Sequence, residues 1–290
     1  MRRDGGYVTL ATLVACCLLA GIVSTLVLLA QPTLVLTRLG VDDLVTESLL
    51  DSGATASSYL LFTEGKSAQS IDGSTITLTT GTVTLHVTAE AARLDLNTSP
   101  PELLKGLFSA VDGQSLSPEA FAARVVDWRD EDNERTPEGA ERVDYTGREA
   151  SSLPMNGKFQ SVGELRFLRG LSENDYMKLE SFLTVHNRTG LLYPGAASRK
   201  ALLAIPDMSE ADASALAGLA SDDEIDEQRS LIQKYKGFLT EEIPTVYRLN
   251  LVAHSKSGRT GTAEMIVGDA NDSPKGYVVY AWSLTGPEAR

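Results

Sequence analysis

The sequence predicts an α+β fold. A long N-terminal membrane-spanning helix packs on a small antiparallel sheet, and a large all-α domain of helix hairpins is inserted between the strands. Three observations carry this prediction: an uncharged apolar run opens the chain, alternating apolar and polar residues recur in two distant groups, and helix-capping signals repeat between those groups. With 290 residues, 42% of them hydrophobic, the chain can form one large core or two modest ones.

The apolar run extends from Tyr7 to Ala30 without a charged residue, which is enough helix to cross a hydrocarbon core. Arg2 and Arg3 precede it, and basic residues favour the cytoplasmic side of a membrane. Pro32 marks an expected kink, after which apolar residues recur at a spacing that suits one long helix with a single buried stripe. These residues are Leu34, Leu39, Leu44, Leu49, Leu50 and Leu60.

Three interpretations of the N-terminus stay open. A short basic leader that ends in glycine before an intact apolar helix is typical of type IV pilin-like precursors, which a prepilin peptidase would cut here between Gly6 and Tyr7. The sequence LVAC, ending at Cys16, fits a lipoprotein signal, but the apolar run continues well past it. An uncleaved anchor is the third interpretation. An ordinary signal peptide is disfavoured, because its apolar core is shorter and ends at a small-residue site.

Residues 74–87 alternate between apolar and polar side chains around Gly81, which predicts a β-hairpin. The same alternation returns in residues 246–253, 261–267 and 277–284. Because a lone hairpin is marginal in water, we expect these segments to join in one antiparallel sheet.

Helix-start signals repeat between the two groups of strands. Ser99-Pro-Pro-Glu102 predicts a capping box with proline at the first helical position, and Ser117-Pro118 opens a second helix. Residues 161–179 and 201–216 each predict two helices joined by a turn, and Ser172 is the expected N-cap of the second helix in the first pair. Similar hairpins bind DNA in helix-hairpin-helix proteins, but these turns carry acidic residues where that module needs basic ones. The acidic residues are Glu173, Asp175, Asp207, Glu210 and Asp212.

The chain is strongly acidic, with a formal net charge of −13 and a pI of about 4.7. Such a balance repels nucleic-acid phosphates and suits a divalent cation or a basic partner. The two cysteines, Cys16 and Cys17, are adjacent and lie in the apolar run, so no structural disulfide is expected. Packing must therefore hold the fold, with a metal ion as a further option.

Residues 127–144, DWRDEDNERTPEGAERVD, crowd carboxylates into one irregular segment. Asp130, Asp132 and Glu134 alternate like the start of an EF-hand loop, but Arg135 stands where that loop requires glycine. A calcium site of another kind fits better, since calcium takes about six to eight oxygens in loose geometry. Zinc is disfavoured, because none of the three histidines lies nearby. The alternative is a solvated loop whose arginines balance its charge.

Four segments form a recognisable set: ARLDLNTSPPELL, VVDWRDEDNERTPEGAERVDY, LPMNGKFQSVGELRFLRGLS and LTVHN. Together they resemble the K-type minor pseudopilin of bacterial type II secretion systems, most specifically between Leu94 and Ser172. Ala11 agrees with this family, which lacks the glutamate that other pilins carry at the fifth mature position. The sequence departs from the family at residues 192–197, LYPGAA, where an Asn-Thr-Ala-Pro phrase is usual.

The resemblance implies a tip subunit that is anchored in the inner membrane by one helix, with its C-terminal part in the periplasm. It would cap the major pseudopilin filament together with I- and J-type minor pseudopilins and support protein export. The implied organisation is a leader at 1–6, a transmembrane helix at 7–30, a pilin-like helix and sheet at 31–95 and 241–290, and an inserted helical domain at 96–240.

The resemblance also implies calcium binding in the helical domain, and the acidic loop matches the place where the family's ligands cluster. The implied ligands are Asp127, Asp130, Asp132, Glu141 and Asp144, with Asn133 and Asn156 in second place. The runner-up function is a membrane-anchored helix-hairpin-helix DNA receptor of a competence system, which the charge disfavours. No enzymatic activity is expected, because the sequence has no nucleophile elbow, phosphate-binding glycine loop or metalloprotease motif.

Overall fold

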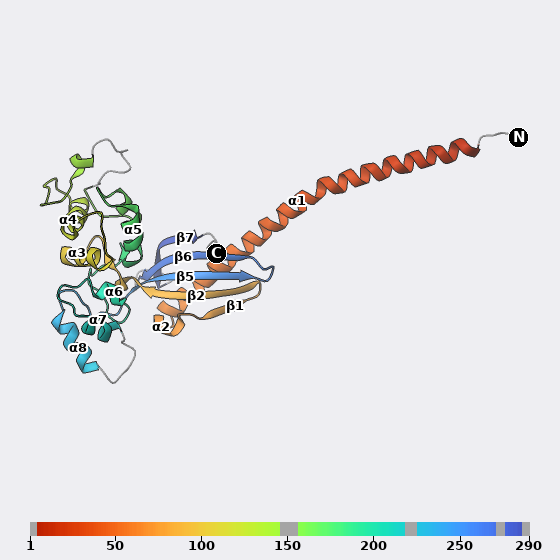
Figure 1. Cartoon of the computed structure of the whole chain (residues 1–290). Coiled ribbons are helices and arrows are strands. Elements are labelled where there is room, and N and C mark those ends of the chain that lie inside the picture. The colour runs from red at the N-terminus through yellow and green to blue at the C-terminus, as the bar shows by residue number, and fades with distance from the viewer. Residues whose placement is uncertain (1–4, 146–155, 218–224, 271–275, 286–290) are drawn as a thin grey trace.

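The computed structural model describes residues 5–145, 156–217, 225–270 and 276–285. Helix α1 (Gly5–Phe62) opens the chain as one helix that passes through Pro32 without interruption. Its N-terminal part projects away from the rest of the molecule, its C-terminal part lies on a sheet, and a cluster of helices lies at the far end of that sheet (Figure 1). The predicted α+β class is confirmed.

The five long strands form one antiparallel sheet in the order β1-β2-β5-β6-β7. They are β1 (Thr75–Leu78), β2 (Gly81–Ala89), β5 (Val246–Ser255), β6 (Thr260–Asp269) and β7 (Tyr277–Thr285). Leu78 lies opposite Gly81, so β1 and β2 form the predicted hairpin. A register shift between Ile266 and Val267 displaces β7 along β6. Each predicted strand is present, and the single sheet is confirmed.

The C-terminal part of α1 packs on one face of the sheet, which we call the inner face. Leu49, Leu50 and Ala54 are buried there against Val83 and the other apolar residues of the strands. Gly53 permits this approach, since a Cβ at that position would lie 2.7 Å from a methyl of Val83. The predicted buried stripe is wrong at Leu44, which is 67% exposed, because the sheet covers α1 only from about the next turn onward.

A short helix, α2 (Ala68–Ile71), precedes the sheet. The segment between β2 and β5 is mainly helical. The α-helices of this segment are α3 (Pro101–Ala110), α4 (Pro118–Arg129), α5 (Glu173–Leu179), α6 (Arg199–Leu202), α7 (Glu210–Ala217) and α8 (Ile225–Lys234). Its 3-10 helices are η1 (Glu90–Ala92), η2 (Arg142–Tyr145), η4 (Val162–Phe167) and η5 (Glu180–Phe182). Contrary to the all-α prediction, β3 (Leu94–Asp95) and β4 (Leu183–Thr184) form a short parallel pair.

Two of the three predicted helix caps are present. Ser117 caps α4 by accepting a hydrogen bond from the backbone of Ala120, and Ser172 caps α5 in the same way. The capping box at Ser99 is wrong, because α3 begins at Pro101 and Pro100 is its N-cap. The buried Ser99 hydroxyl instead accepts from the Asp95 amide at 2.8 Å and donates to the Gly190 carbonyl at 3.0 Å. It therefore joins two loops and does not start a helix.

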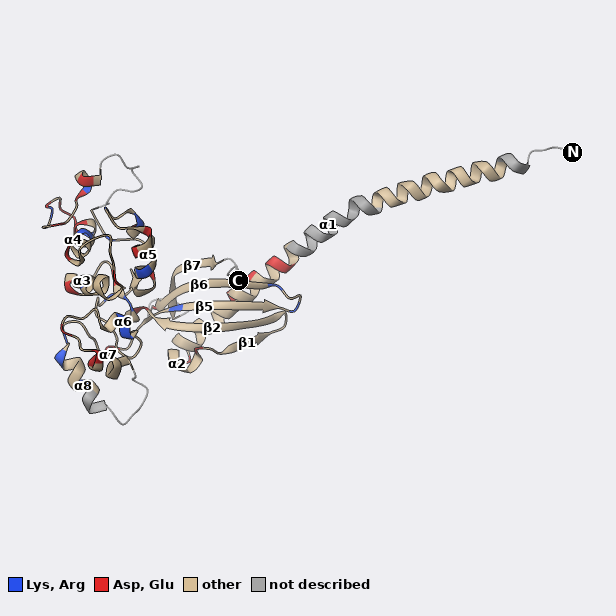
Figure 2. Cartoon of the chain, in the orientation of Figure 1, with Lys and Arg blue, Asp and Glu red and all other residues tan. Residues whose placement is uncertain are grey.

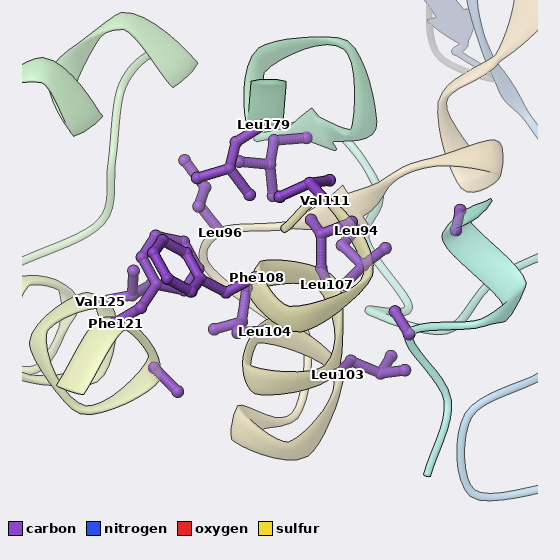
Figure 3. Packing of buried hydrophobic residues seen from close by; sticks show 14 of the residues in the cluster. Leu94, Leu96, Leu103, Leu104, Leu107, Phe108, Val111, Phe121, Val125 and Leu179 are labelled. Carbon is purple, nitrogen blue, oxygen red and sulfur yellow. The ribbon is translucent and has the colours of Figure 1, made fainter. Parts of the chain in front are cut away.

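The helical segment has a hydrophobic cluster of its own, separate from the cluster under α1. Figure 3 shows leucines of α3 and of the β3 strand around the rings of Phe108 and Phe121, whose centroids lie 4.9 Å apart. Trp128 belongs to this cluster and stacks on Phe159 with centroids 5.4 Å apart. The exact domain boundaries proposed from the sequence stay predictions.

Candidate metal centre

Three carboxylates converge where α4 ends. Asp127 lies in the last turn of α4, Asp130 is its C-cap, and Glu141 precedes η2. One oxygen from each lies within 4.8 Å of the others. Asp127 and Glu141 are buried, at 0% and 1% exposed, and Asp130 is half-buried. The acidic residues of this region colour the end of α4 and the following loop red in Figure 2. We call these three residues the carboxylate cluster.

Several oxygens of the site are buried, and no donor for them lies among the described residues. They are Oδ1 of Asp130, both carboxylate oxygens of Glu141 and Oδ1 of Asn156. Burying a charge or a polar group without a partner is costly, so native structures rarely leave a whole group of acceptors unpaired. A set of convergent oxygens from carboxylates and an amide is the donor set that calcium prefers. The residues present therefore fit a calcium ion.

The loop after α4 is pressed against the cluster. The Asp127 carboxylate accepts from the Thr136 amide at 3.2 and 3.3 Å. A Cβ on Gly139 would lie 2.0 Å from Oδ2 of Asp127, so a larger residue there would displace the carboxylate. This contact fixes Asp127 from the side of the loop.

The electrostatics of the cluster disfavour three separate negative charges. Burial raises the pKa of Asp130, and the neighbouring Asp132 and Asp127 carboxylates raise it further. Burial also raises the pKa of Glu141, with Asp127 and Asp130 adding to the effect. A raised carboxyl pKa means that the folded site resists the charged form unless a cation compensates it.

The other predicted ligands lie around the cluster in different settings. Asp132 is exposed, and its side chain accepts from the Glu134 amide at 2.7 Å. Asn133 is exposed and accepts from the Asn156 side-chain amide at 3.0 Å. Asp144 accepts from the Glu141 amide at 3.0 Å and lies 3.4 Å from Arg135, so donors already serve both of its oxygens. All the ligand roles stay predictions.

Gly6 and Tyr7, the predicted cleavage position, lie in the first turn of α1, and their side chains fall outside the described residues. The candidate membrane span is Val8–Leu26, with a mean hydropathy of 2.2 and none of it buried within the chain. By length and composition this part of α1 could cross a membrane.

Two of the quoted segments, ARLDLNTSPPELL and LTVHN, are hydrogen-bonded to each other beside the β3–β4 pair. Within LDLN, Oδ1 of Asp95 accepts from the Asn97 amide at 2.7 Å. Its Oδ2 accepts from the amide of Asn187, in LTVHN, at 2.8 Å. The Asn187 side chain in turn donates to the carbonyls of Arg93 and Leu191. These residues hold the start of the helical segment together.

A buried charge group at the junction between sheet and helices was missed by the sequence analysis. Glu90 is 0% exposed and lies 2.8 Å from the Arg248 guanidinium and 3.1 Å from that of Arg93. It also accepts from the Thr184 hydroxyl. Burial alone would raise the pKa of Glu90, but the two guanidinium groups hold it below its ordinary value. Glu90 and Arg248 are 158 positions apart, so no local pattern could reveal the pair.

Comparison with known proteins agrees with the resemblance. Residues 85–188 match the model of the family described as "Type II secretion system (T2SS), protein K". No curated protein matches the chain. A solved structure, the GspK-GspI-GspJ complex of the Type 2 Secretion System from enterotoxigenic Escherichia coli, contains a chain with the same fold. The TM-score is 0.63 at 16% identity, and the alignment covers 86% of this chain and 99% of that chain.

The matched range contains all four of the quoted segments and the carboxylate cluster. The alignment with the solved chain extends beyond that range, so the similarity of fold is not confined to the matched residues. Residues 85–188 therefore match the protein K family of the type II secretion system, and the chain has the fold of a chain in the GspK-GspI-GspJ complex.

Proposed function

We propose that this chain is a minor pseudopilin that caps the tip of the type II secretion pseudopilus and supports protein export from there. In this proposal α1 anchors it in the inner membrane after a prepilin peptidase cut between Gly6 and Tyr7. The rest of the chain lies in the periplasm, above the major pseudopilin filament. The subunit works by assembly and catalyses no reaction.

The observation that carries the proposal is the position of the helical segment. It leaves the sheet at the end of β2 and returns at the start of β5, at the end of the sheet that points away from the projecting part of α1 (Figure 1). A pilin-like filament grows by adding subunits whose helices stack side by side. A bulky helical cluster at the membrane-distal end would obstruct a further subunit above it.

We expect labelled protein to be found at one end of each filament only. The measurement is gold labelling of an epitope-tagged chain on overproduced pseudopili, imaged by electron microscopy, with a tagged major pseudopilin as the control for access. Labels distributed along the filament would contradict the tip assignment.

A calcium ion is part of the proposal. Asp127, Asp130 and Glu141 would hold it, with the amide oxygen of Asn156 as a further ligand; their convergence and their unpaired oxygens support this assignment. The bound ion would neutralise the carboxylates and so tie the end of α4 to the loop that returns at η2. Its role is structural.

The I- and J-type partners would dock on a groove between α1 and β7. α1 does not cover the inner face of β7, so Val279, Trp282 and Leu284 are 45%, 39% and 53% exposed there. Together with Thr55 and Ser58 of α1, residues of β7 line a groove of about 230 Å³. A groove beside a helix, with exposed apolar side chains on one wall, suits a second helix packed against it. This groove is therefore the surface that we assign to the partners.

Trp282→Asp is expected to reduce co-purification of the I- and J-type subunits with the full-length chain in detergent several-fold. A charge would replace the largest apolar side chain of the groove, and aromatic anchors carry much of the binding energy of interfaces. Met177→Asp is the matched control, because Met177 is 58% exposed on α5, away from the groove. Wild-type recovery of both partners with Trp282→Asp would reject this docking surface.

A further inference from the structure

One edge of the sheet is open over the last residues of β2. β1 pairs with β2 only as far as Thr84. The next pairs join Leu85 to the turn before β1. The Gly73 amide donates to the Leu85 carbonyl at 2.8 Å, and the Leu85 amide donates to the Ser74 carbonyl at 2.9 Å. Beyond that point, the side chain of Asp72 accepts from the Val87 amide at 2.9 Å. No strand follows along this edge among the described residues.

The open edge offers one acceptor and one donor. Since both backbone groups of Leu85 face this edge, those of Val87 and Ala89 face it too, because the direction alternates along a strand. Within the described parts of the chain, neither the Val87 carbonyl nor the Ala89 amide has a hydrogen-bond partner. Both residues are buried, at 6% and 5% exposed. Buried backbone groups are nearly always paired, so this edge is prepared for a ligand or for water.

A cleft of about 460 Å³ lies along this edge, a volume in the range of ligand sites. Val87, Thr88 and Ala89 form one side of it. Its apolar wall consists of Leu61, Tyr193, Pro244 and Tyr247. A second hollow of about 280 Å³ shares Gln69, Tyr193 and Gly195 with the first and extends it towards α8. We call the two together the β2-edge cleft.

The charges at the cleft favour an acidic ligand. Lys66 lines the first hollow and Arg229 the second, and neither makes an ion pair with any described residue. The chain as a whole has a net charge of −13, so these two basic side chains differ in sign from most of its charged residues.

Each hollow also holds one carboxylate: Asp72 lines the first and Glu241 the second. Oδ1 of Asp72 accepts from the Val87 amide and lies 3.4 Å from Nδ1 of His86, whereas Lys66 has no such partner among the described residues. An acidic side chain of a ligand could therefore pair with Lys66.

We propose that the β2-edge cleft binds an extended, acidic segment of a different polypeptide, which adds as a short strand to the open edge of β2. An amide of that segment would donate to the Val87 carbonyl, and a carbonyl would accept from the Ala89 amide. One apolar side chain would contact the wall at Tyr247, and one acidic side chain would face Lys66. Strand addition of this kind takes affinity from the backbone and specificity from the side chains. The proposal does not depend on the position of the subunit in the filament.

The test uses the full-length chain in detergent micelles and a fluorescein-labelled peptide, EVEVEVE, with blocked ends. Binding is measured by fluorescence anisotropy. The decisive variant is Ala89→Pro, which removes the amide donor. Ala89 has φ −72° and ψ 138°, values that proline adopts readily, and its amide bonds to no described residue, so the fold should tolerate the change. We expect the peptide to bind about tenfold more weakly, the effect of one lost hydrogen bond with its donor blocked.

Two further measurements separate the contribution of charge from that of the backbone hydrogen bonds. Lys66→Glu should weaken binding several-fold, and the loss should shrink as salt is raised, because exposed charges are screened. Lys256→Glu is the matched control at the β5–β6 hairpin, remote from the cleft, and should leave binding unchanged. A peptide methylated on alternate backbone nitrogens should bind more weakly than EVEVEVE, since it keeps the side chains and loses amide donors.

Some results would overturn the proposal. No binding of EVEVEVE to the wild-type chain up to millimolar concentration would do so, as would equal affinity for Ala89→Pro when its melting temperature is that of the wild type. Sedimentation of the wild-type chain and the Ala89→Pro variant tests self-association. A wild-type dimer that Ala89→Pro dissociates would show that a second copy of this chain occupies the edge, against the proposal.

Discussion

Chelation of calcium is expected to lower the melting temperature of the full-length chain by roughly 5–10 °C. An ion that binds only the folded state stabilises it by about 2.7 kcal/mol at a hundred times its dissociation constant. For a protein of this size, each kcal/mol shifts the melting temperature by roughly 2–4 °C. The measurement is a thermal melt in detergent with calcium, with magnesium at the same concentration, and with chelator. Magnesium should replace calcium poorly, because it demands a smaller, more regular site.

Asp130→Asn gives this prediction a distinctive pattern. In calcium the variant should melt below the wild type, because a charged ligand is lost. In chelator it should melt at or above the wild type, because burial and the neighbouring carboxylates raise the pKa of Asp130 and so disfavour its charge. Glu102→Gln, an exposed residue on α3, is the matched control and should respond to calcium as the wild type does. Identical melts of the wild type with and without calcium would reject the metal centre.

The elements that depend on local pattern were predicted well from the sequence. Alternation around Gly81 predicts the β1–β2 hairpin because side chains of a strand alternate between its faces. Ser117 and Ser172 predict helix starts because a cap acts within one turn. The proximity of Asp127 and Asp130 also follows from helical spacing, whereas Glu141 joins them only through the path of the loop.

What depends on distant parts of the chain could not be predicted in this way. Ser99 has every local feature of a capping residue, yet its hydroxyl bonds to Gly190, 91 positions away. Leu44 continues an apolar stripe that the sheet does not reach. Asp144 stands among the acidic residues, and the sequence does not reveal that the Glu141 amide and Arg135 bond to its oxygens. In each case the local signal is the same, and tertiary contacts decide the outcome.

Glu90→Gln is expected to destabilise the chain by about 3–5 kcal/mol, the usual result of removing one partner from a buried ion pair. The change leaves the guanidinium groups of Arg248 and Arg93, which are 18% and 17% exposed, without their shared counter-charge. Arg248 keeps a second carboxylate, that of Glu264 at 3.1 Å, whose side chain is 31% exposed. The measurement is urea unfolding followed by tryptophan fluorescence. Trp128 reports on the helical cluster and Trp282 on β7, so the data also show whether the two parts still unfold together.

Two variants separate an electrostatic effect from lost packing. Adding Arg248→Met to Glu90→Gln should recover part of the lost stability, because it removes a guanidinium that has lost its buried partner, and Glu264, 31% exposed, is left to solvent. Glu119→Gln is the matched control, since Glu119 pairs with Lys105 at 2.6 Å with both side chains about half exposed. Such surface pairs contribute little, so this variant should unfold close to the wild type. A double variant less stable than Glu90→Gln would exclude the electrostatic explanation.

The effect of Glu90→Gln should also depend on pH in one direction. The folded state lowers the pKa of Glu90 below its ordinary value of 4.5, because Arg248 and Arg93 outweigh the burial that would raise it. A carboxyl with a lowered pKa contributes its full stabilisation above the ordinary value, and that contribution is lost as the pH falls through the folded-state pKa. The stability difference between wild type and variant should therefore be constant near neutral pH and shrink below about pH 4.5. A difference that stays the same down to pH 3 would mean that Glu90 acts through its shape and hydrogen bonds, not through its charge.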